Sequence, residues 1–269
     1  MCLLFLINIT FAKVNDSGAE IEWSYKGNLG PARWGQINPE FKLCAEGKNQ
    51  SPINIINKKD VNVDDILSSI YQTEPLILLN DGETELVIGS TQELINDGHT
   101  LQINTADVKE NIVYGKNKYH LVQFHFHSPS ENLLNGESNP LEIHFVHQGT
   151  NGRVIVVGVF VKSGEFNETL QTIIDNVSPV KDTEYTIQKV SVNPANLIPD
   201  NKNYFAFKGS LTTPPCTEGL QWIVMETPIT ATPAQIMQIR KIINGDNARH
   251  IQPLRDRVIF YAKEEGKAL

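Results

Sequence analysis

The segment Val122–Glu131, VQFHFHSPSE, alternates apolar and polar residues with a period of two, which predicts a half-buried strand. One face of this strand carries ordinary core residues: Val122, Phe124 and Phe126. The other face carries an amide and two imidazoles: Gln123, His125 and His127. Side chains two residues apart on a strand project to the same side, about 6–7 Å apart along the backbone. Both imidazoles can therefore bind one metal ion.

A third ligand is expected from a neighbouring strand, and the next strand-like run is Leu141–His147, LEIHFVH. Alternation places Glu142, His144 and Val146 on one face and His147 on the other. We therefore predict His144 as the third ligand. His147 is predicted to be a hydrogen-bonded histidine of the core.

Two polar residues, Gln123 and Glu142, each precede one of these histidines by two positions. Each can lie beside an imidazole and fix its orientation and tautomer. Three neutral histidines with an open fourth position are typical of a catalytic zinc, whose bound water has a pKa of about 7. Strand histidines that pair within a polar core, without a metal, are the alternative.

A different metal site is also compatible with the first segment. The spacing His125-x-His127-x₃-Glu131 resembles the first motif of cupins, double-sheet jelly rolls that bind iron or manganese through histidines and a glutamate. However, Gly136 falls too early for that motif, and the later Gly-Pro-Gly turn with its histidine and asparagine is absent. A cupin-like metalloenzyme therefore ranks second.

The rest of the chain predicts a mainly β (α+β) fold: a single domain over residues 20–262, built on a large, mostly antiparallel twisted sheet with a few peripheral helices. Residues 20–60 are rich in Gly, Pro and Asn and predict an irregular wrap. Helical periodicity occurs over Phe166–Val177 and over Pro233–Ile243, with Thr232 as N-cap. The predicted strands are Leu76–Leu79, Thr84–Ile88, Thr100–Ile103, Tyr119–His127, Leu141–Gln148, Val154–Lys162, Glu184–Val190, Tyr204–Phe207 and Gln221–Met225.

Charge limits the classes of partner. The 269-residue chain has a net charge of −8. This acidic excess argues against nucleic acid and against anionic membranes, both of which attract basic surfaces. The sequence leaves the oligomeric state open, a homodimer included.

The N-terminus predicts export. Residues 1–12 contain the apolar run CLLFLINITFA, which is too short to span a bilayer and has the length and small-residue end of a signal peptide remnant. An N-terminal strand is the alternative. Removal of this leader would leave Cys44 and Cys216 as an even pair, which predicts one disulfide in a periplasmic or secreted protein. Two buried free thiols are the alternative to that bond.

With these motifs in view, the chain resembles the alpha-class carbonic anhydrases from about Trp23 to Tyr261. Several specific segments match in family order and spacing: WSY from Trp23, WG from Trp34, NQSPINI from Asn49, NDGHT from Asn96, QFHFHSPSE from Gln123, LEIHFVH from Leu141, GSLTTPPCTEGLQWIV from Gly209 and NARHIQPL from Asn247. Ser128 and Asn132 depart from residues common in the family. The SPSE segment and the cysteine pair fit its secreted bacterial members.

The resemblance implies one zinc per chain, held by His125, His127 and His144. It implies reversible hydration of carbon dioxide to bicarbonate and a proton by zinc-bound hydroxide. Thr212 would accept a hydrogen bond from that hydroxide and donate its own proton to Glu131, which makes Glu131 an acceptor rather than a ligand.

The resemblance also implies roles for residues that spacing alone leaves in a core or on a surface. The substrate pocket would comprise Val146, Val156, Leu211, Thr213 and Trp222. His99 would carry protons to solvent, because imidazole exchanges protons near neutral pH. Tyr25 and Asn96 would order the water chain to it. Some family members have lost ligands and act as binding modules, whereas all three histidines, Thr212 and Glu131 are present here.

Overall fold

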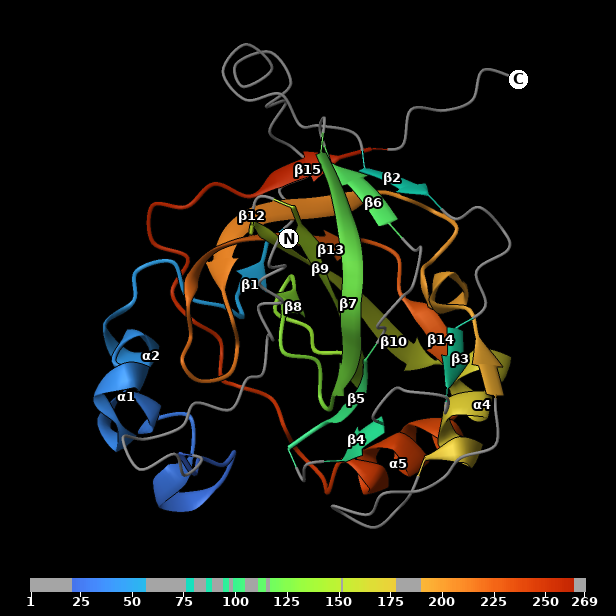
Figure 1. Cartoon of the computed structure of the whole chain (residues 1–269), viewed down its shortest axis with the longest axis horizontal. Coiled ribbons are helices and arrows are strands. Elements are labelled where there is room, and N and C mark those ends of the chain that lie inside the picture. Colours follow the sequence, from blue (N-terminus) through green and yellow to red (C-terminus); the bar gives the residue numbers. More distant parts are fainter. Residues whose placement is uncertain are drawn as a thin grey trace, which may run out of the picture.

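A mixed sheet, with eleven strands in the part of the chain that the structure describes, forms the centre of the molecule (Figure 1). The computed structural model describes residues 21–56, 76–79, 86–88, 94–96, 99–104, 111–114, 117–150, 152–177 and 190–263. The main path of the sheet runs in the order β15 (Phe260–Ala262), β12 (Tyr204–Ser210), β13 (Glu218–Met225), β10 (Val154–Ser163), β9 (Leu141–Gly149), β7 (Asn117–His127), β5 (Leu101–Asn104) and β4 (Leu94–Asn96). Off this path lie β14 (Ile229–Ala231), β6 (Asn111–Tyr114) and β2 (Leu76–Leu79).

The strand pairing confirms the predicted fold class. Neighbours along the path are antiparallel, except that β10 pairs in parallel with β13. Off the path, β14 also pairs in parallel with β10. The predicted strand Leu76–Leu79 has the bounds of β2, and the other predicted strands in the described residues differ by a few residues at their ends. Most of the predicted strand Glu184–Val190 lies outside the described residues, where only its last residue is placed, in β11 (Val190–Val192).

Strand β7 contains a β-bulge that changes its alternation. Its register against β9 shifts between Leu121 and Gln123, so Val122 has no partner across the strand pair. An extra residue in one strand reverses the side-chain alternation beyond it. Leu121, Phe124 and Phe126 therefore share the buried core, while Val122 is only partly buried. The prediction that Val122 belongs to this core face is wrong for that reason.

Two helices pack together beside the sheet (Figure 1). Helix α4 (Glu168–Asn176) begins after Asn167, whose side chain accepts from the Leu170 amide at 2.9 Å, and this cap sets its start inside the predicted range. Helix α5 (Pro233–Ile242) begins after Thr232, the predicted N-cap, which forms a capping box with Gln235.

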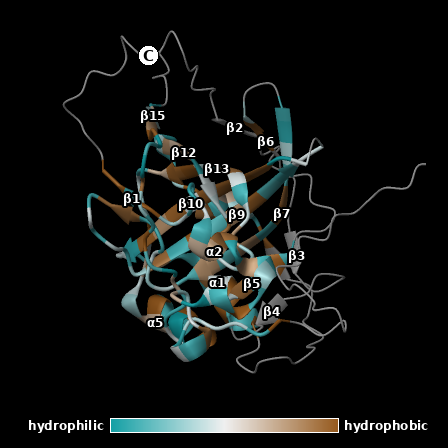
Figure 2. Cartoon of the chain, turned by 90° about the vertical axis from the view of Figure 1, so that its left-hand side faces the viewer, coloured by the Kyte–Doolittle hydropathy of each residue, from teal (hydrophilic) through white to brown (hydrophobic). Residues whose placement is uncertain are grey.

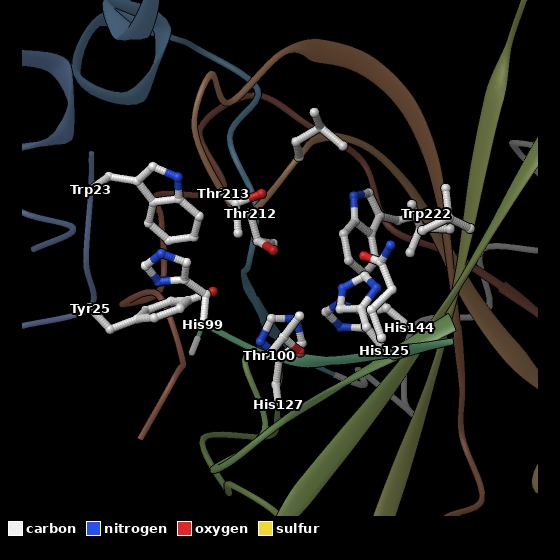
Figure 3. A pocket seen from close by; sticks show the side chains of 14 residues that line it. Trp23, Tyr25, His99, Thr100, His125, His127, His144, Thr212, Thr213 and Trp222 are labelled. Atoms are coloured by element: carbon white, nitrogen blue, oxygen red, sulfur yellow. The ribbon is translucent and has the colours of Figure 1, made fainter. Parts of the chain in front are cut away.

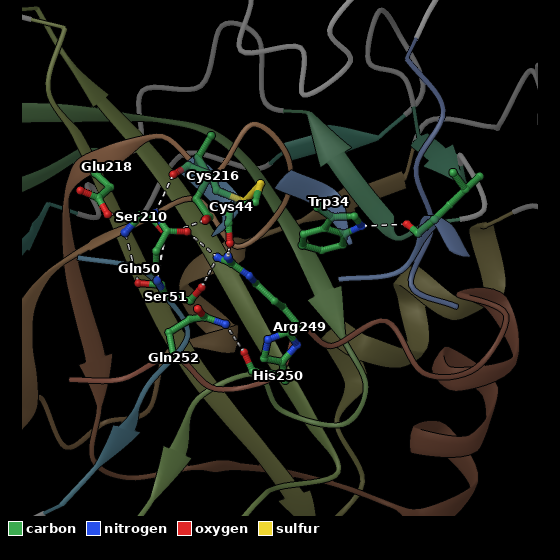
Figure 4. Close-up of a disulfide and its surroundings, with 12 residues drawn as sticks. Trp34, Cys44, Gln50, Ser51, Ser210, Cys216, Glu218, Arg249, His250 and Gln252 are labelled. Carbon is green, nitrogen blue, oxygen red and sulfur yellow. Dashed lines mark hydrogen bonds between the residues drawn. A yellow bond between two sulfur atoms is a disulfide. The ribbon is translucent and has the colours of Figure 1, made fainter. Parts of the chain in front are cut away.

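The remaining described elements are short. An irregular N-terminal wrap contains η1 (Gly27–Leu29), α1 (Trp34–Ile37), η2 (Pro39–Phe41), α2 (Leu43–Glu46) and β1 (Asn54–Ile55), which pairs in parallel with β8 (Leu133–Leu134). Elsewhere β3 (Leu86–Ile88) pairs with β11, and η3 (Pro194–Leu197) follows β11. Cys44 of α2 is disulfide-bonded to Cys216, in the loop between β12 and β13 (Figure 4). The predicted disulfide is present, and the alternative of two free thiols is wrong.

The sheet separates two hydrophobic clusters, one on each of its faces. The larger cluster packs one sheet face against α4 and α5. The smaller one covers the other face, where Val146, Val156 and Trp222 lie on adjacent strands. Figure 2 shows hydrophobic residues concentrated on strands such as β12 and β13, with hydrophilic residues on the outer turns. None of the described helices is long and apolar enough to cross a bilayer.

Candidate metal centre

Three histidines converge on the face of the sheet that carries the smaller cluster (Figure 3). His125 and His127 lie two residues apart on β7, and His144 lies directly opposite His125 on β9. One ligand atom from each ring lies within 4.8 Å of the other two. The fourth candidate, His147, is buried on the opposite face, where its Nδ1 lies 3.1 Å from the Phe145 carbonyl oxygen. Strand alternation thus brings together the three predicted ligands and excludes His147.

The tautomers of the two β7 histidines are set by oxygen atoms. His125 Nδ1 lies 2.8 Å from Gln123 Oε1, and His127 Nδ1 lies 2.9 Å from the Asn247 carbonyl oxygen. An oxygen acceptor at Nδ1 requires a proton on Nδ1, so the lone pair of each ring is on Nε2. Asn247 lies in the matching segment NARHIQPL, but the sequence predicted no role for it. Its contact with His127 is made by a backbone carbonyl, which does not depend on residue type.

His144 is oriented the other way round. Its Nε2 lies 3.1 Å from Glu142 Oε1, close to the carboxylate although the two atoms are not aligned as a hydrogen bond. A proton on Nε2 would face this carboxylate and would leave the lone pair on Nδ1. The Glu142 carboxylate is held in turn by Asn132, whose backbone N–H and side-chain amide each donate to it at 2.8 Å. Asn132, a departure from the family pattern, thus contacts the carboxylate that orients a predicted ligand.

Burial keeps these rings neutral. It lowers the pKa of His127 to about 4 and the pKa values of His125 and His144 well below the usual 6.5. The buried Nε2 of His127 has no hydrogen-bond partner among the described residues. A buried lone pair without a donor is costly unless it binds something. Three neutral imidazoles with converging lone pairs fit a tetrahedral zinc with one open position.

Thr212 and Glu131 lie together beside this group and are both buried. The Arg249 backbone N–H donates to Glu131 Oε1 at 2.8 Å, and the Thr212 hydroxyl lies close enough to the Glu131 carboxylate to lower its pKa. Burial raises the pKa of Glu131 to about 8 against the lowering effect of these two groups. Glu131 Oε2 lies 3.5 Å from His127 Nε2. The family resemblance predicted the roles of Thr212 and Glu131. It did not predict the hydrogen bond from the Arg249 backbone N–H to Glu131.

An apolar wall faces the histidines across a cavity with about 540 Å³ of empty space, its open mouth included. The predicted pocket residues all line this cavity: Val146, Val156, Leu211, Thr213 and Trp222. The Trp222 ring meets the His144 ring edge-on, with centroids 4.9 Å apart. The Trp222 indole N–H donates to the Ser210 carbonyl at 3.0 Å, which fixes the ring.

Aromatic residues line the outer part of the cavity (Figure 3). The His99 ring stacks on Trp23, with centroids 4.2 Å apart and planes 15° apart, and Tyr25 lies beside it at 6.4 Å between centroids. Asn96 ends strand β4, and its side chain lies outside the described residues. Trp23 was part of a matching segment, but its contact with His99 was not predicted. Gln102 and Thr100 also line the cavity and were not predicted.

Comparison with known proteins agrees with this geometry. The family model described as eukaryotic-type carbonic anhydrase matches residues 29–263. The chain is 36% identical to a carbonic anhydrase of Pectobacterium carotovorum, over 97% of this chain and 98% of that protein. It is 37% identical to a carbonic anhydrase of a Nostoc species, over 90% of this chain and 86% of that protein.

Solved structures agree as well. The alpha-carbonic anhydrase of Thermovibrio ammonificans, solved with the inhibitor sulfanilamide, superposes with a TM-score of 0.78 at 34% identity. The match covers 89% of this chain and 98% of that one. The family match and the large open sheet rule out the cupin-like alternative. The chain belongs to the eukaryotic-type, or alpha, carbonic anhydrase family.

Proposed function

We propose that this chain is a zinc enzyme that interconverts carbon dioxide with bicarbonate and a proton. The observation that carries the proposal is the cluster of three neutral imidazoles, whose lone pairs converge at the base of a cavity with one apolar wall. Zinc at such a site lowers the pKa of its bound water to about 7 and so supplies a nucleophile near neutral pH. His125, His127 and His144 would hold the ion.

The residues behind the ligands set their geometry. Gln123 would hold the His125 ring and Glu142 the His144 ring, each through the nitrogen that does not face the ion. Such partners orient the ligand and raise its basicity. A neutral histidine needs no deprotonation before it binds a metal, so the lowered pKa values favour metal uptake at neutral pH.

Thr212 and Glu131 would orient the attacking oxygen. With its hydroxyl proton directed at the adjacent Glu131 carboxylate, Thr212 would keep its oxygen lone pairs free to accept a hydrogen bond from a donor in the cavity. A nucleophile that donates to Thr212 points its own lone pair towards the substrate, a positioning effect. The carboxylate form of Glu131 is required for this, and a nearby dication favours that form.

The apolar wall suits a small nonpolar substrate. Val146, Val156, Leu211 and Trp222 offer carbon dioxide van der Waals contact without hydrogen bonds, and bicarbonate gains little there and leaves. Thr213 lies at the same cavity and supplies one polar group beside the product. Selectivity for an uncharged reactant would follow from this division between the apolar wall and the polar ligands.

His99 would carry the released proton to solvent. It lies on the cavity lining with Tyr25, outside the three histidines, and imidazole exchanges protons near neutral pH. Tyr25 and Asn96 would order the intervening water. Residues 20–262 would form the catalytic domain, and residues 1–12 an export signal to the periplasm or the medium. The Cys44–Cys216 disulfide supports that location, because such bonds persist in oxidising compartments.

Zinc stoichiometry combined with stopped-flow carbon dioxide hydration tests the proposal. The wild type should bind one zinc and hydrate carbon dioxide, and His144→Ala should lose both, because two imidazoles cannot complete a three-ligand site. His147→Gln is the matched control, since His147 lies on the opposite sheet face, and it should keep zinc and activity. Wild-type protein that binds zinc without hydrating carbon dioxide would instead support a binding module of the same family.

A further inference from the structure

The Glu142 carboxylate is completely buried, yet both of its oxygens are hydrogen-bonded by one residue. Oε2 accepts from the Asn132 backbone N–H, and Oε1 accepts from Asn132 Nδ2, both at 2.8 Å. Oε1 is also the atom that lies 3.1 Å from His144 Nε2. Two donors from one residue fix the plane of the carboxylate as well as its position. The carboxylate therefore presents Oε1 to the His144 ring in one fixed position.

The orientation of Asn132 is itself fixed. Its Oδ1 accepts from the Ile53 backbone N–H at 3.1 Å, where the chain enters β1, so its Nδ2 must face Glu142. Asn132 is fully buried, and its amide contacts a donor on one side and an acceptor on the other. An aspartate there would keep the acceptor for Ile53 but would place a second negative charge against Glu142. The Asn132 amide satisfies both neighbours.

Gly158 on β10 provides the space that Glu142 occupies. It pairs with His144 across β9 and β10, on the face that also carries Val156 and Phe160. A Cβ at Gly158 would lie 2.8 Å from Glu142 Oε1 and 3.4 Å from a Val224 methyl. Its backbone torsion is not in the region that favours glycine. A glycine inside a strand often marks a close approach by another group, and here that group is the carboxylate.

We propose that Asn132 and Gly158 are positioning residues that hold the Glu142 carboxylate against His144 and thereby determine how tightly the three-histidine site retains its metal. The inference rests on the proposed zinc function and deepens it. Neither residue contacts the cavity or the predicted ligands through its own side chain. Both act through Glu142, by donating to it or by leaving it room.

The test is zinc affinity, measured by competition between the apoprotein and a chelator of known affinity. Removal of a group that supports a metal ligand costs about 10–100-fold in metal affinity, and these residues act one contact further out. Asn132→Ala, Asn132→Asp and Gly158→Ala should each weaken zinc binding about tenfold. Matched controls are Asn167→Ala, which removes a side chain with two hydrogen bonds far from the site, and Gly164→Ala, which adds a clash with Thr230. The controls should reduce the stability of the apoprotein and leave zinc affinity at the wild-type value.

A double-mutant cycle shows whether the effect passes through Glu142. In a Glu142→Ala background the added Cβ has room, and the Asn132 donors have lost their acceptor. Gly158→Ala and Asn132→Ala should therefore cause no further loss of zinc affinity there. An equal loss in both backgrounds would overturn the proposal, as would wild-type zinc affinity in the single variants.

Two further outcomes separate this inference from the proposed function. Wild-type protein that binds no zinc would refute the function and the inference together. Wild-type protein that binds zinc while every single variant does so equally well would refute the inference alone. If Asn132→Ala does not fold, the nearly isosteric Asn132→Asp and the strand variant Gly158→Ala each decide the question through the same cycle.

Discussion

At the scale of single residues, identical side chains differ through their surroundings. His144 and His147 are three residues apart on β9, and both are buried. His144 faces two other imidazoles and a carboxylate, whereas His147 lies beside the Phe145 carbonyl. Because a strand alternates its faces, an odd separation puts the two rings on opposite sides. His144 is therefore placed at the candidate metal centre, and His147 is placed in the core.

His147 should make stability depend on pH. Burial lowers its pKa from 6.5 to about 4, so between these values the unfolded chain binds more protons than the folded chain. The free energy of unfolding should therefore rise with pH through this window and fall as the solution is acidified. From pH 7 to pH 5 the loss due to this residue alone should be about 2 kcal/mol.

Urea denaturation at the two pH values checks this. His147→Gln should show a smaller loss of stability on acidification than the wild type, and the difference between the two proteins isolates His147 from the other histidines. His120→Gln, which removes an exposed imidazole from β7, is the control. Equal losses in wild type and His147→Gln would contradict the lowered pKa.

His99→Ala should separate proton transfer from hydration. Attack on carbon dioxide requires the metal centre alone, so kcat/KM should stay near the wild-type value. Removal of a positioned proton-transfer group should lower kcat by roughly one to two orders of magnitude. Stopped-flow hydration assays with and without a high concentration of imidazole buffer measure both effects, and added imidazole should restore much of kcat. A parallel fall in kcat and kcat/KM without rescue would mean that His99 does not carry protons.

At the scale of elements, the β7–β9 pair builds the metal centre. Its register places His125 opposite His144 and His127 opposite Glu142. The bulge at Val122 lies just before the histidines and is followed by regular pairing. Period-two alternation after the bulge was sufficient to predict the ligand face, because both His125 and His127 lie beyond it. Val122, the bulged residue, was assigned to the wrong face, since one inserted residue leaves no mark in composition.

The cap of α5 should contribute measurably to stability and nothing to metal binding. Thr232 Oγ1 accepts from the Gln235 backbone N–H at 3.3 Å, and the Gln235 side chain accepts from the Thr232 backbone N–H at 3.1 Å. Loss of such an N-cap costs about 1 kcal/mol. Thr232→Ala should lower the free energy of unfolding by about that amount in urea denaturation and keep wild-type zinc affinity. Changed zinc affinity would show that α5 is coupled to the site.

At the scale of the whole molecule, the N-terminal wrap is tied to the site from two sides. The Arg249 guanidinium, drawn in Figure 4, donates to the Cys44 carbonyl at 2.9 Å and to the Ser51 carbonyl at 2.7 Å. The same residue's backbone N–H donates to Glu131. The disulfide attaches Cys216, four residues after Thr212, to the same wrap. The Thr212–Glu131 pair is therefore linked to the wrap at both of its members.

The Cys44–Cys216 disulfide should leave neither thiol free, and it should strongly stabilise the folded chain. The two cysteines are 172 residues apart in sequence. For a loop of this length, chain-entropy models give a stabilisation of roughly 4–5 kcal/mol. Thiol titration of unreduced, denatured protein that lacks residues 1–12 should find no free thiol, and Cys44→Ser/Cys216→Ser should unfold at a much lower urea concentration. Two titratable thiols, or a double variant as stable as the wild type, would contradict this role.

Local periodicity was enough to predict the ligand face, the two longer helices and the mainly antiparallel sheet. Alternation along a strand and spacing along a helix involve residues close in sequence, so they can be recognised without coordinates. The parity of Gln123, His125, Glu142 and His144 is of this kind. The roles of Thr212, Glu131 and His99 required the family resemblance, because a threonine, a glutamate and a loop histidine are common in any sequence.

The supporting contacts depended on the folded chain. The Asn247 carbonyl that orients His127 is 120 residues from it, and the Arg249 amide that holds Glu131 is 118 residues from that carboxylate. Both partners are backbone atoms, which every residue possesses, so no residue type identifies them in advance. The close approach of Glu142 to Gly158 likewise requires the register of β9 against β10. Long-range packing sets such contacts, and it is specified only when the whole sheet has assembled.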